Sequence, residues 1–252
     1  MPAIAVQLAG LSRRWGQLCA IDEVSLSIQP GERVALIGPS GCGKSTLLHL
    51  VAATLAASAG KVTVDGKTVG RMSEKALRAY RARCGIIPQG CSLVPQLSVH
   101  HNMLIGLLPR WPFYRVAAAA LFPYAMERKR VRNWLGKVRL ADRQNQLAGT
   151  LSGGEQQRVA VIRALLPGPA LVLADEPSAS LDPSTARLVV DLLLGQTHPA
   201  TVLLSTHWVS RIATSVDRLV GLRAGRIVID AAPDDVSDED LTALYAGSDE
   251  LR

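Results

Sequence analysis

Alternating and continuous apolar segments predict a sheet at the start of the chain. Residues 3–8 and 24–28 alternate apolar and polar side chains, as half-buried strands do, and the continuous apolar run 33–37 is typical of a central strand. The polar segment 11–16, which contains the lone aromatic residue Trp15, is expected to form a turn between the first two strands.

Helical and extended patterns then follow one another. The pattern predicts a helix from Lys44 to about Ala57 and a strand at 61–66 that closes on an Asp-Gly turn. A polar helix at 73–83 and a short buried strand at 84–87 come next.

Helical periods replace strands between Gln89 and Leu165, which indicates a helical lobe inserted into an α/β core. Strands return at 170–174 and 201–205, and the segment 218–229 has the pattern of a hairpin. We therefore predict a discontinuous core at 1–88 and 166–230, a helical subdomain at 89–165 and a helical C-terminal tail at 231–252.

Composition adds an excess of positive charge to this picture. The 252 residues carry a formal charge of +7, which would suit nucleic acid, an anionic membrane face or an acidic partner. The apolar run 116–126 is too short to span a bilayer, and the first residues lack the basic start of a secretory signal. We expect a soluble cytoplasmic protein whose four scattered cysteines are reduced.

Aromatic residues concentrate in the helical lobe. Half of the ten lie within fourteen positions: Trp111, Phe113, Tyr114, Phe122 and Tyr124. They form either a small satellite core or a partly exposed surface for a partner, and the sequence leaves both open. The basic segment 128–139 is expected to be a solvated helix face.

The segment from Gly38 to Thr46, GPSGCGKST, has the composition of a phosphate-binding loop. Its glycines let backbone N–H groups converge on phosphate oxygens, and the helix that follows adds the positive end of its dipole. Lys44 would reach the β- and γ-phosphates, and the Ser45 hydroxyl would bind Mg²⁺. The alternative is an ordinary glycine-rich turn, but the strand before the loop and the helix after it favour the phosphate site.

Two acidic residues follow the strand at 170–174. Asp175 could hold Mg²⁺ through water, while Glu176 points the other way and could orient or deprotonate a water. His207 follows the strand at 201–205 and would lie at the same carboxyl edge, where ligands of open α/β sheets bind.

A second anion-binding helix start is expected in LSGGEQQR, residues 151–158. Ser152 can cap this helix, and Gly153 and Gly154 expose backbone N–H groups. Taken alone, Trp15 is more typical of a packing residue, and a Gln such as Gln89 after a strand indicates nothing.

Together these segments resemble the ATP-binding subunit of ATP-binding cassette (ABC) transporters. The resemblance covers nearly the whole chain and rests on the Gly38 loop, Gln89, LSGGEQQRVA from Leu151, LVLADEP from Leu171, SLD from Ser180 and His207. It implies an α/β fold: a P-loop NTPase (RecA-like) core with an N-terminal antiparallel β region and an inserted α-helical subdomain.

The resemblance also implies roles for individual residues. Catalysis would depend on Glu176 as general base, on His207 at the γ-phosphate, and on Gln89 and Lys44. Mg²⁺ would be bound by Ser45, Gln89 and Asp175. Nucleotide contacts, with Trp15 stacked on adenine, are implied for Trp15, Gly38, Pro39, Ser40, Gly41, Cys42, Gly43, Lys44, Ser45, Thr46, Ser152, Gly153, Gly154 and Asp182.

The family further implies partners. Two copies would form a head-to-tail dimer with ATP between the Gly38 loop of one copy and Ser152 of the other, and hydrolysis would move membrane permease subunits. A periplasmic solute-binding protein would take part indirectly. The chain would lie at the cytoplasmic face of the inner membrane, with no nucleic acid bound.

The subfamily is suggested by softer similarity. ADEPSASLDP from Ala174 and DRLVGLRAGRIVID from Asp217 are similar to phosphonate-import ATPases, with phosphite, phosphate or another small anion left open. An exporter or lipid-extracting ATPase would share every catalytic residue. A soluble ABC ATPase acting on ribosomes or DNA is disfavoured, because the chain has one cassette and no sustained heptads.

Overall fold

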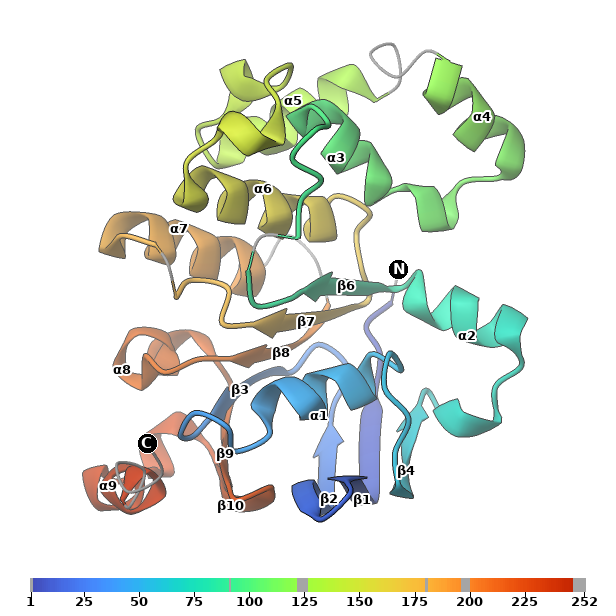
Figure 1. The fold of residues 1–252 in the computed structure, drawn as a ribbon. Helices are drawn as coiled ribbons and strands as arrows, with labels where there is room; N and C mark the ends of the chain where they lie inside the picture. The colour runs from blue at the N-terminus through green and yellow to red at the C-terminus, as the bar shows by residue number, and fades with distance from the viewer. Residues whose placement is uncertain (1, 91, 122–126, 180, 196–199, 247–252) are drawn as a thin grey trace.

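The computed structural model describes residues 2–90, 92–121, 127–179, 181–195 and 200–246, and these form two sheets with helices around them (Figure 1). The first sheet is antiparallel, in the order β2-β1-β4-β5. Its strands are β1 (Val6–Trp15), β2 (Leu18–Ile28), β4 (Ala59–Val64) and β5 (Lys67–Thr68).

The second sheet has the order β10-β9-β3-β8-β7-β6 and is parallel except for the hairpin of β9 and β10. Its strands are β3 (Arg33–Ile37), β6 (Cys84–Ile87), β7 (Leu171–Asp175), β8 (Thr201–Ser205), β9 (Arg218–Arg223) and β10 (Arg226–Ala231). Because β3, β7 and β8 run parallel, the residues that follow them meet at one edge of the sheet.

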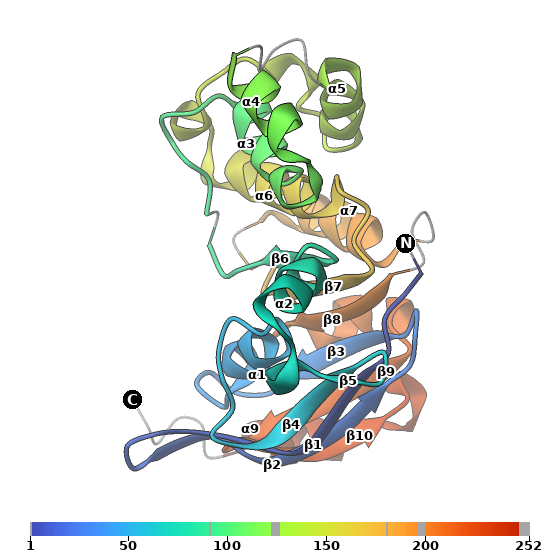
Figure 2. The same ribbon diagram turned by 90° about the vertical axis from the view of Figure 1, so that its right-hand side faces the viewer.

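Two hydrophobic layers cover the parallel sheet. Val34 and Leu36 of β3 pack in a layer with α1 (Lys44–Val51) and the antiparallel sheet. Ala35 and Ile37 point to the other face and pack with α7 (Pro183–Leu194) and α8 (Val209–Ile212). Helix α1 therefore lies between the two sheets (Figure 2).

A group of helices at one end of the molecule has its own core (Figure 1). It contains α3 (Val99–Ile105), α4 (Phe113–Leu121), α5 (Arg128–Lys137) and α6 (Gly153–Leu165), and α2 (Glu74–Arg81) lies outside it. Short 3₁₀ turns occur at Val69–Arg71, Leu108–Arg110, Ala141–Arg143, Ala148–Thr150, Ala213–Ser215 and Pro233–Asp235, and the last helix is α9 (Asp238–Tyr245).

Among the helices of the described residues, none is long and apolar enough to reach across a lipid bilayer.

Some aromatic residues of the helical lobe belong to a satellite core, and others form an exposed surface. Trp111 packs against the lobe's core, under the guanidinium of Arg115 at 4.8 Å from the ring centre. Phe113 and Tyr114 are 86% and 75% exposed. Phe122 and Tyr124 lie outside the described residues. The lobe therefore has a satellite core at Trp111 and an exposed aromatic pair next to it.

Two boundaries predicted from the pattern are wrong. The turn expected at 11–16 is strand, since β1 continues through Trp15 after a register shift between Ala9 and Ser12 that breaks the alternation. The first helix ends at Val51 rather than near Ala57, because Ala53 adopts φ +57° and turns the chain out of the helix.

Candidate functional site

The Gly38 loop joins β3 to α1 and requires its glycines for close backbone approach. Gly38 and Gly43 have φ angles of +139° and +109°. A Cβ on Gly38 would lie 2.1 Å from the carbonyl oxygen of Leu222, and one on Gly43 would lie 2.4 Å from that of Ala20. No L side chain fits at either position without displacing backbone, so the shape of the loop depends on these residues.

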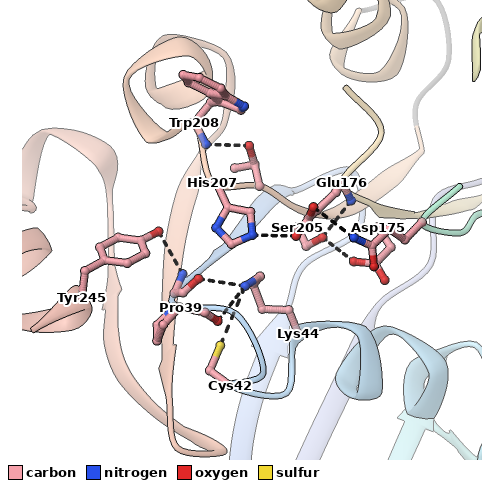
Figure 3. Close-up of polar contacts among 12 residues, drawn as sticks. Pro39, Cys42, Lys44, Asp175, Glu176, Ser205, His207, Trp208 and Tyr245 are labelled. Atoms are coloured by element: carbon pink, nitrogen blue, oxygen red, sulfur yellow. Dashed lines mark hydrogen bonds and ion pairs between the residues drawn. The ribbon is translucent and has the colours of Figure 1, made fainter. Parts of the chain in front are cut away.

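Lys44 folds back onto this loop. Its side chain is buried, and Nζ donates to the carbonyl oxygens of Gly38 at 2.8 Å and Pro39 at 3.0 Å (Figure 3). The Cys42 thiol lies 4.0 Å from the same ammonium, and burial raises the pKa of this thiol, so it stays protonated at neutral pH. The ammonium group of Lys44 therefore lies inside the loop that was predicted to bind phosphate.

The carboxylate of Asp175 is fixed by the neighbouring strand. Asp175 follows Leu171 and Leu173 in the alternation of β7, so it lies on the α1 side of the sheet. The hydroxyl of Ser205, opposite Asp175 in the register of β7 and β8, donates to its Oδ1 at 2.6 Å. The same Ser205 oxygen accepts the backbone N–H of Glu176 at 2.9 Å. Ser205 therefore orients both acidic residues.

Glu176 connects the ends of three strands. Its backbone is left-handed, with φ +46°, and this conformation is uncommon for a residue with a side chain. Its Oε1 lies 2.6 Å from His207 Nε2, and its Oε2 accepts from the amide nitrogen of Gln89 at 3.4 Å. The carboxylate is thus positioned by a histidine that follows β8 and a glutamine that follows β6 (Figure 3 shows the histidine).

A cleft of about 590 Å³ brings together half of the expected nucleotide residues, and its lining does not include Gly38, Pro39 or Cys42 of the loop. Trp15, at the end of β1, is 48% exposed and forms one wall. The guanidinium of Arg13 lies 4.3 Å from the ring centre of Trp15. Trp15 lines the cleft, whereas Arg13 does not. The cleft is lined by Trp15, Leu18, Ala20, Ser40, Gly41, Gly43, Lys44, Ser45, Thr46, Gln89 and Glu176.

Ser152 lies outside this cleft, at the start of α6. Its side chain accepts from the N–H of Glu155, and the Glu155 carboxylate accepts from the N–H of Ser152. The pKa of the Glu155 carboxyl is lowered, with the hydrogen bond from the backbone N–H of Ser152 as the main cause. Gly153 and Gly154, which follow in the first turn, are also absent from the cleft lining.

Asp182 also lies outside the cleft, as the N-cap of α7. Its Oδ1 accepts from the N–H groups of Ser184 and Thr185, each at 3.1 Å. Hydrogen bonds from Ser184 and then Thr185 hold the pKa of Asp182 well below its usual range. Ser180, which precedes this cap in SLD, is outside the described residues.

Comparison with known proteins identifies the family. Residues 21–179 match the family model described as ABC transporter. The chain belongs to the ABC transporter family. Relatives in this family include the phosphonates import ATP-binding protein PhnC of Frankia casuarinae, 42% identical over 98% of both chains. PhnC 2 of Pseudomonas savastanoi is also 42% identical, over 96% of this chain and 89% of its own.

Solved structures of ABC cassettes share the fold. The ATP-binding cassette MJ0796, in a dimeric post-hydrolysis state bound to ADP and Pi, aligns with a TM-score of 0.78 and 28% identity. The alignment covers 90% of this chain and 98% of that one. The predicted fold, a P-loop NTPase core with an antiparallel β region and inserted helices, is confirmed.

Two supporting residues of this ABC family member, Ser205 and Arg13, were not predicted from the sequence. Ser205 was read only as the last residue of a buried strand. A hydroxyl at the end of an apolar strand, next to the strand that ends at Asp175, could have indicated a partner for that carboxylate. Arg13 was assigned to a turn, and its place behind Trp15 follows from the alternation of a strand that was not recognised there.

Proposed function

We propose that this chain hydrolyses ATP as the ATPase subunit of an ABC importer for phosphonate or a related small anion. One observation carries the proposal: Glu176, oriented by Ser205, His207 and Gln89, faces the same cleft as the Gly38 loop. A positioned carboxylate opposite a phosphate loop is what hydrolysis of a phosphoanhydride requires.

The cleft would bind ATP through its two ends. The Lys44 ammonium, now bonded to two loop carbonyls, can exchange these partners for phosphate oxygens, which are stronger acceptors because they are charged. The exposed face of Trp15 would stack on adenine, a contact worth about 1–3 kcal/mol for bases on aromatic side chains.

Glu176 would act as the general base. Its carboxylate accepts the proton of the attacking water, and His207 and Gln89 hold it in place for that transfer. His207, whose ring reaches Glu176 on one side, would contact the terminal phosphate on the other. Positioning and charge neutralisation supply most of the rate in phosphoryl transfer, so holding the Glu176 carboxylate in place is the contribution we expect from these side chains.

The residues expected at Mg²⁺ fit that ion. Ser45, Gln89 and Asp175 supply a hydroxyl, an amide and a carboxylate, which offer the hard oxygen donors that Mg²⁺ prefers. Bound Mg²⁺ would neutralise phosphate charge. Within this chain, the Ser205 hydroxyl fixes the Asp175 carboxylate by donating to its Oδ1 at 2.6 Å.

We propose that the site is completed by a second copy of the chain. Ser152, Gly153 and Gly154 begin a helix whose N–H groups are suited to phosphate, yet they lie outside the cleft of their own chain. The dimeric state of the MJ0796 cassette supports a pairing in which each copy supplies these residues to its partner. Asp182 would link the two sites.

The transported solute is inferred from relatives. Relatives that cover nearly the whole chain are named phosphonates import ATP-binding protein PhnC, and this supports a complex with membrane permease subunits that imports phosphonate. A solute-binding protein would be a further component of that complex. The chain would then lie at the cytoplasmic face of the membrane. We propose no solute site in this chain, because its cleft is lined by the residues proposed to bind nucleotide.

A growth experiment tests this function. Cells that lack the chain but keep their permease should not grow on methylphosphonate as the only phosphorus source, and the wild-type gene should restore growth. The Glu176→Gln variant should not restore it. Growth of the deletion strain at the wild-type rate on methylphosphonate would exclude phosphonate as the solute, and the purified chain's ATPase activity would then stand separately.

A further inference from the structure

The last helix of the described chain reaches the phosphate loop. Tyr245, the final residue of α9, accepts a hydrogen bond at its hydroxyl oxygen from the backbone N–H of Gly38, at 3.2 Å (Figure 3). These residues are 207 positions apart in sequence, and the contact joins a C-terminal helix to the first residue of GPSGCGKST.

Helix α9 is held firmly enough to place this hydroxyl. Leu244 is 2% exposed and packs in the hydrophobic layer beneath β3. The guanidinium of Arg223, at the end of β9, donates to the carbonyl oxygens of Ala243 and Ala246 at 2.9 and 3.0 Å. At the other end, Ser237 caps the helix reciprocally with Asp240.

The N–H, the carbonyl oxygen and the α-carbon of Gly38 are each restrained by a neighbouring group. Its N–H is bonded to Tyr245, its carbonyl oxygen accepts from Lys44 Nζ, and its α-carbon faces the Leu222 carbonyl at a distance that excludes a side chain. Tyr245 is the restraint supplied from outside the loop and the sheet. Loss of its hydroxyl would leave the Gly38 N–H without this partner, at the point where β3 ends and the loop begins.

We propose that Tyr245 is a positioning residue, which holds the Gly38 loop in its nucleotide-binding shape and couples the docking of α9 to nucleotide affinity. The inference rests on the proposed binding of nucleotide by this loop. Coupling between two sites is reciprocal, so a nucleotide bound at the loop must stabilise the docked helix as much as the docked helix favours the nucleotide.

The test uses Tyr245→Phe, which removes one hydroxyl, and a fluorescent ADP analogue (mant-ADP) titrated against the full-length chain. The Kd should rise about fivefold, as expected for loss of one net hydrogen bond. Arg223→Ala, which releases the end of α9 without touching the loop, should raise the Kd in the same direction.

A matched control separates positioning from general stability. Tyr80 is buried, and its hydroxyl likewise bonds to the backbone, donating to the carbonyl oxygen of Val51 at 2.6 Å. Tyr80→Phe should lower the melting temperature and leave the Kd for mant-ADP unchanged. If Tyr245→Phe changes only the melting temperature and binds mant-ADP as the wild type does, the proposal is overturned.

Hydrogen exchange gives a readout that needs no nucleotide. Amides of residues 38–44 should exchange faster in Tyr245→Phe than in the wild type, and mant-ADP should slow exchange in 238–245 of the wild type. Unchanged exchange at 38–44 in the variant would overturn the proposal. A wild-type chain that fails to bind mant-ADP, while its variant still shows faster exchange at 38–44, would contradict the proposed function and leave the positioning role supported.

Discussion

His207 and Glu176, which follow adjacent strands of the parallel sheet, are in direct contact, with 2.6 Å between Nε2 and Oε1. The two side chains are 35% and 15% exposed; Glu176 lines the cleft, and His207 contacts it from the neighbouring strand. The carboxylate that we propose as the general base is thereby held by a side chain that follows the neighbouring strand.

Removing the histidine should disable turnover. We expect His207→Ala to lower kcat for ATP hydrolysis about 10²-fold or more, because Glu176, the proposed general base, loses a group that orients it. Trp208→Ala is the matched control, since Trp208 is adjacent in sequence but lines a different pocket, beside α7. Steady-state ATPase assays on both variants check this, and equal losses in the two would argue against a specific role for the ring.

Ser205 should matter to stability as well as to activity. Ser205→Ala leaves the buried Asp175 carboxylate and the Glu176 N–H without the hydroxyl that both use. We expect a loss of about 1–3 kcal/mol in the free energy of unfolding, together with slower ATP hydrolysis. Urea unfolding and an ATPase assay measure the two effects. A stable Ser205→Ala variant with wild-type activity would show that the two acids are oriented by other groups.

The cap of α7 should make stability depend on pH. The pKa of Asp182 is lowered in the folded chain, so its contribution is present above the ordinary carboxyl pKa and is lost as the pH falls through the folded value. Asn caps helices about as well as Asp and carries no charge. The melting temperature of wild type should therefore fall more than that of Asp182→Asn between pH 7 and about pH 3. Parallel curves would exclude this origin.

The exposed aromatic pair and its buried neighbour should respond differently to charge. Phe113→Glu and Tyr114→Glu should change the free energy of unfolding by less than about 0.5 kcal/mol, whereas Trp111→Glu should cost roughly 1–3 kcal/mol. If the pair contacts the permease, both surface variants keep basal ATPase activity and lose transport. Unfolding of the Phe113 and Tyr114 variants would instead favour a purely structural role for the pair.

Sequence reasoning works best where one local pattern determines the outcome. The strand before Asp175, the loop at Gly38 and the cap at Ser152 could each be predicted from a few adjacent residues. Trp15 needed the family resemblance, because a bulged strand hides its alternation. Tyr245 could not be predicted at all, since its partner Gly38 is 207 positions away and is reached only through the docking of α9.

Two copies of this chain are proposed to enclose ATP, and sedimentation of the Glu176→Gln variant tests this pairing most directly. Without the carboxylate that accepts the water proton, ATP should bind and remain intact, so the closed pair should persist. We expect a dimer at saturating ATP and Mg²⁺, a monomer without nucleotide, and a monomer with ATP when Ser152→Arg is added to the same chain. A Glu176→Gln chain that binds ATP and stays monomeric at every concentration would contradict the account.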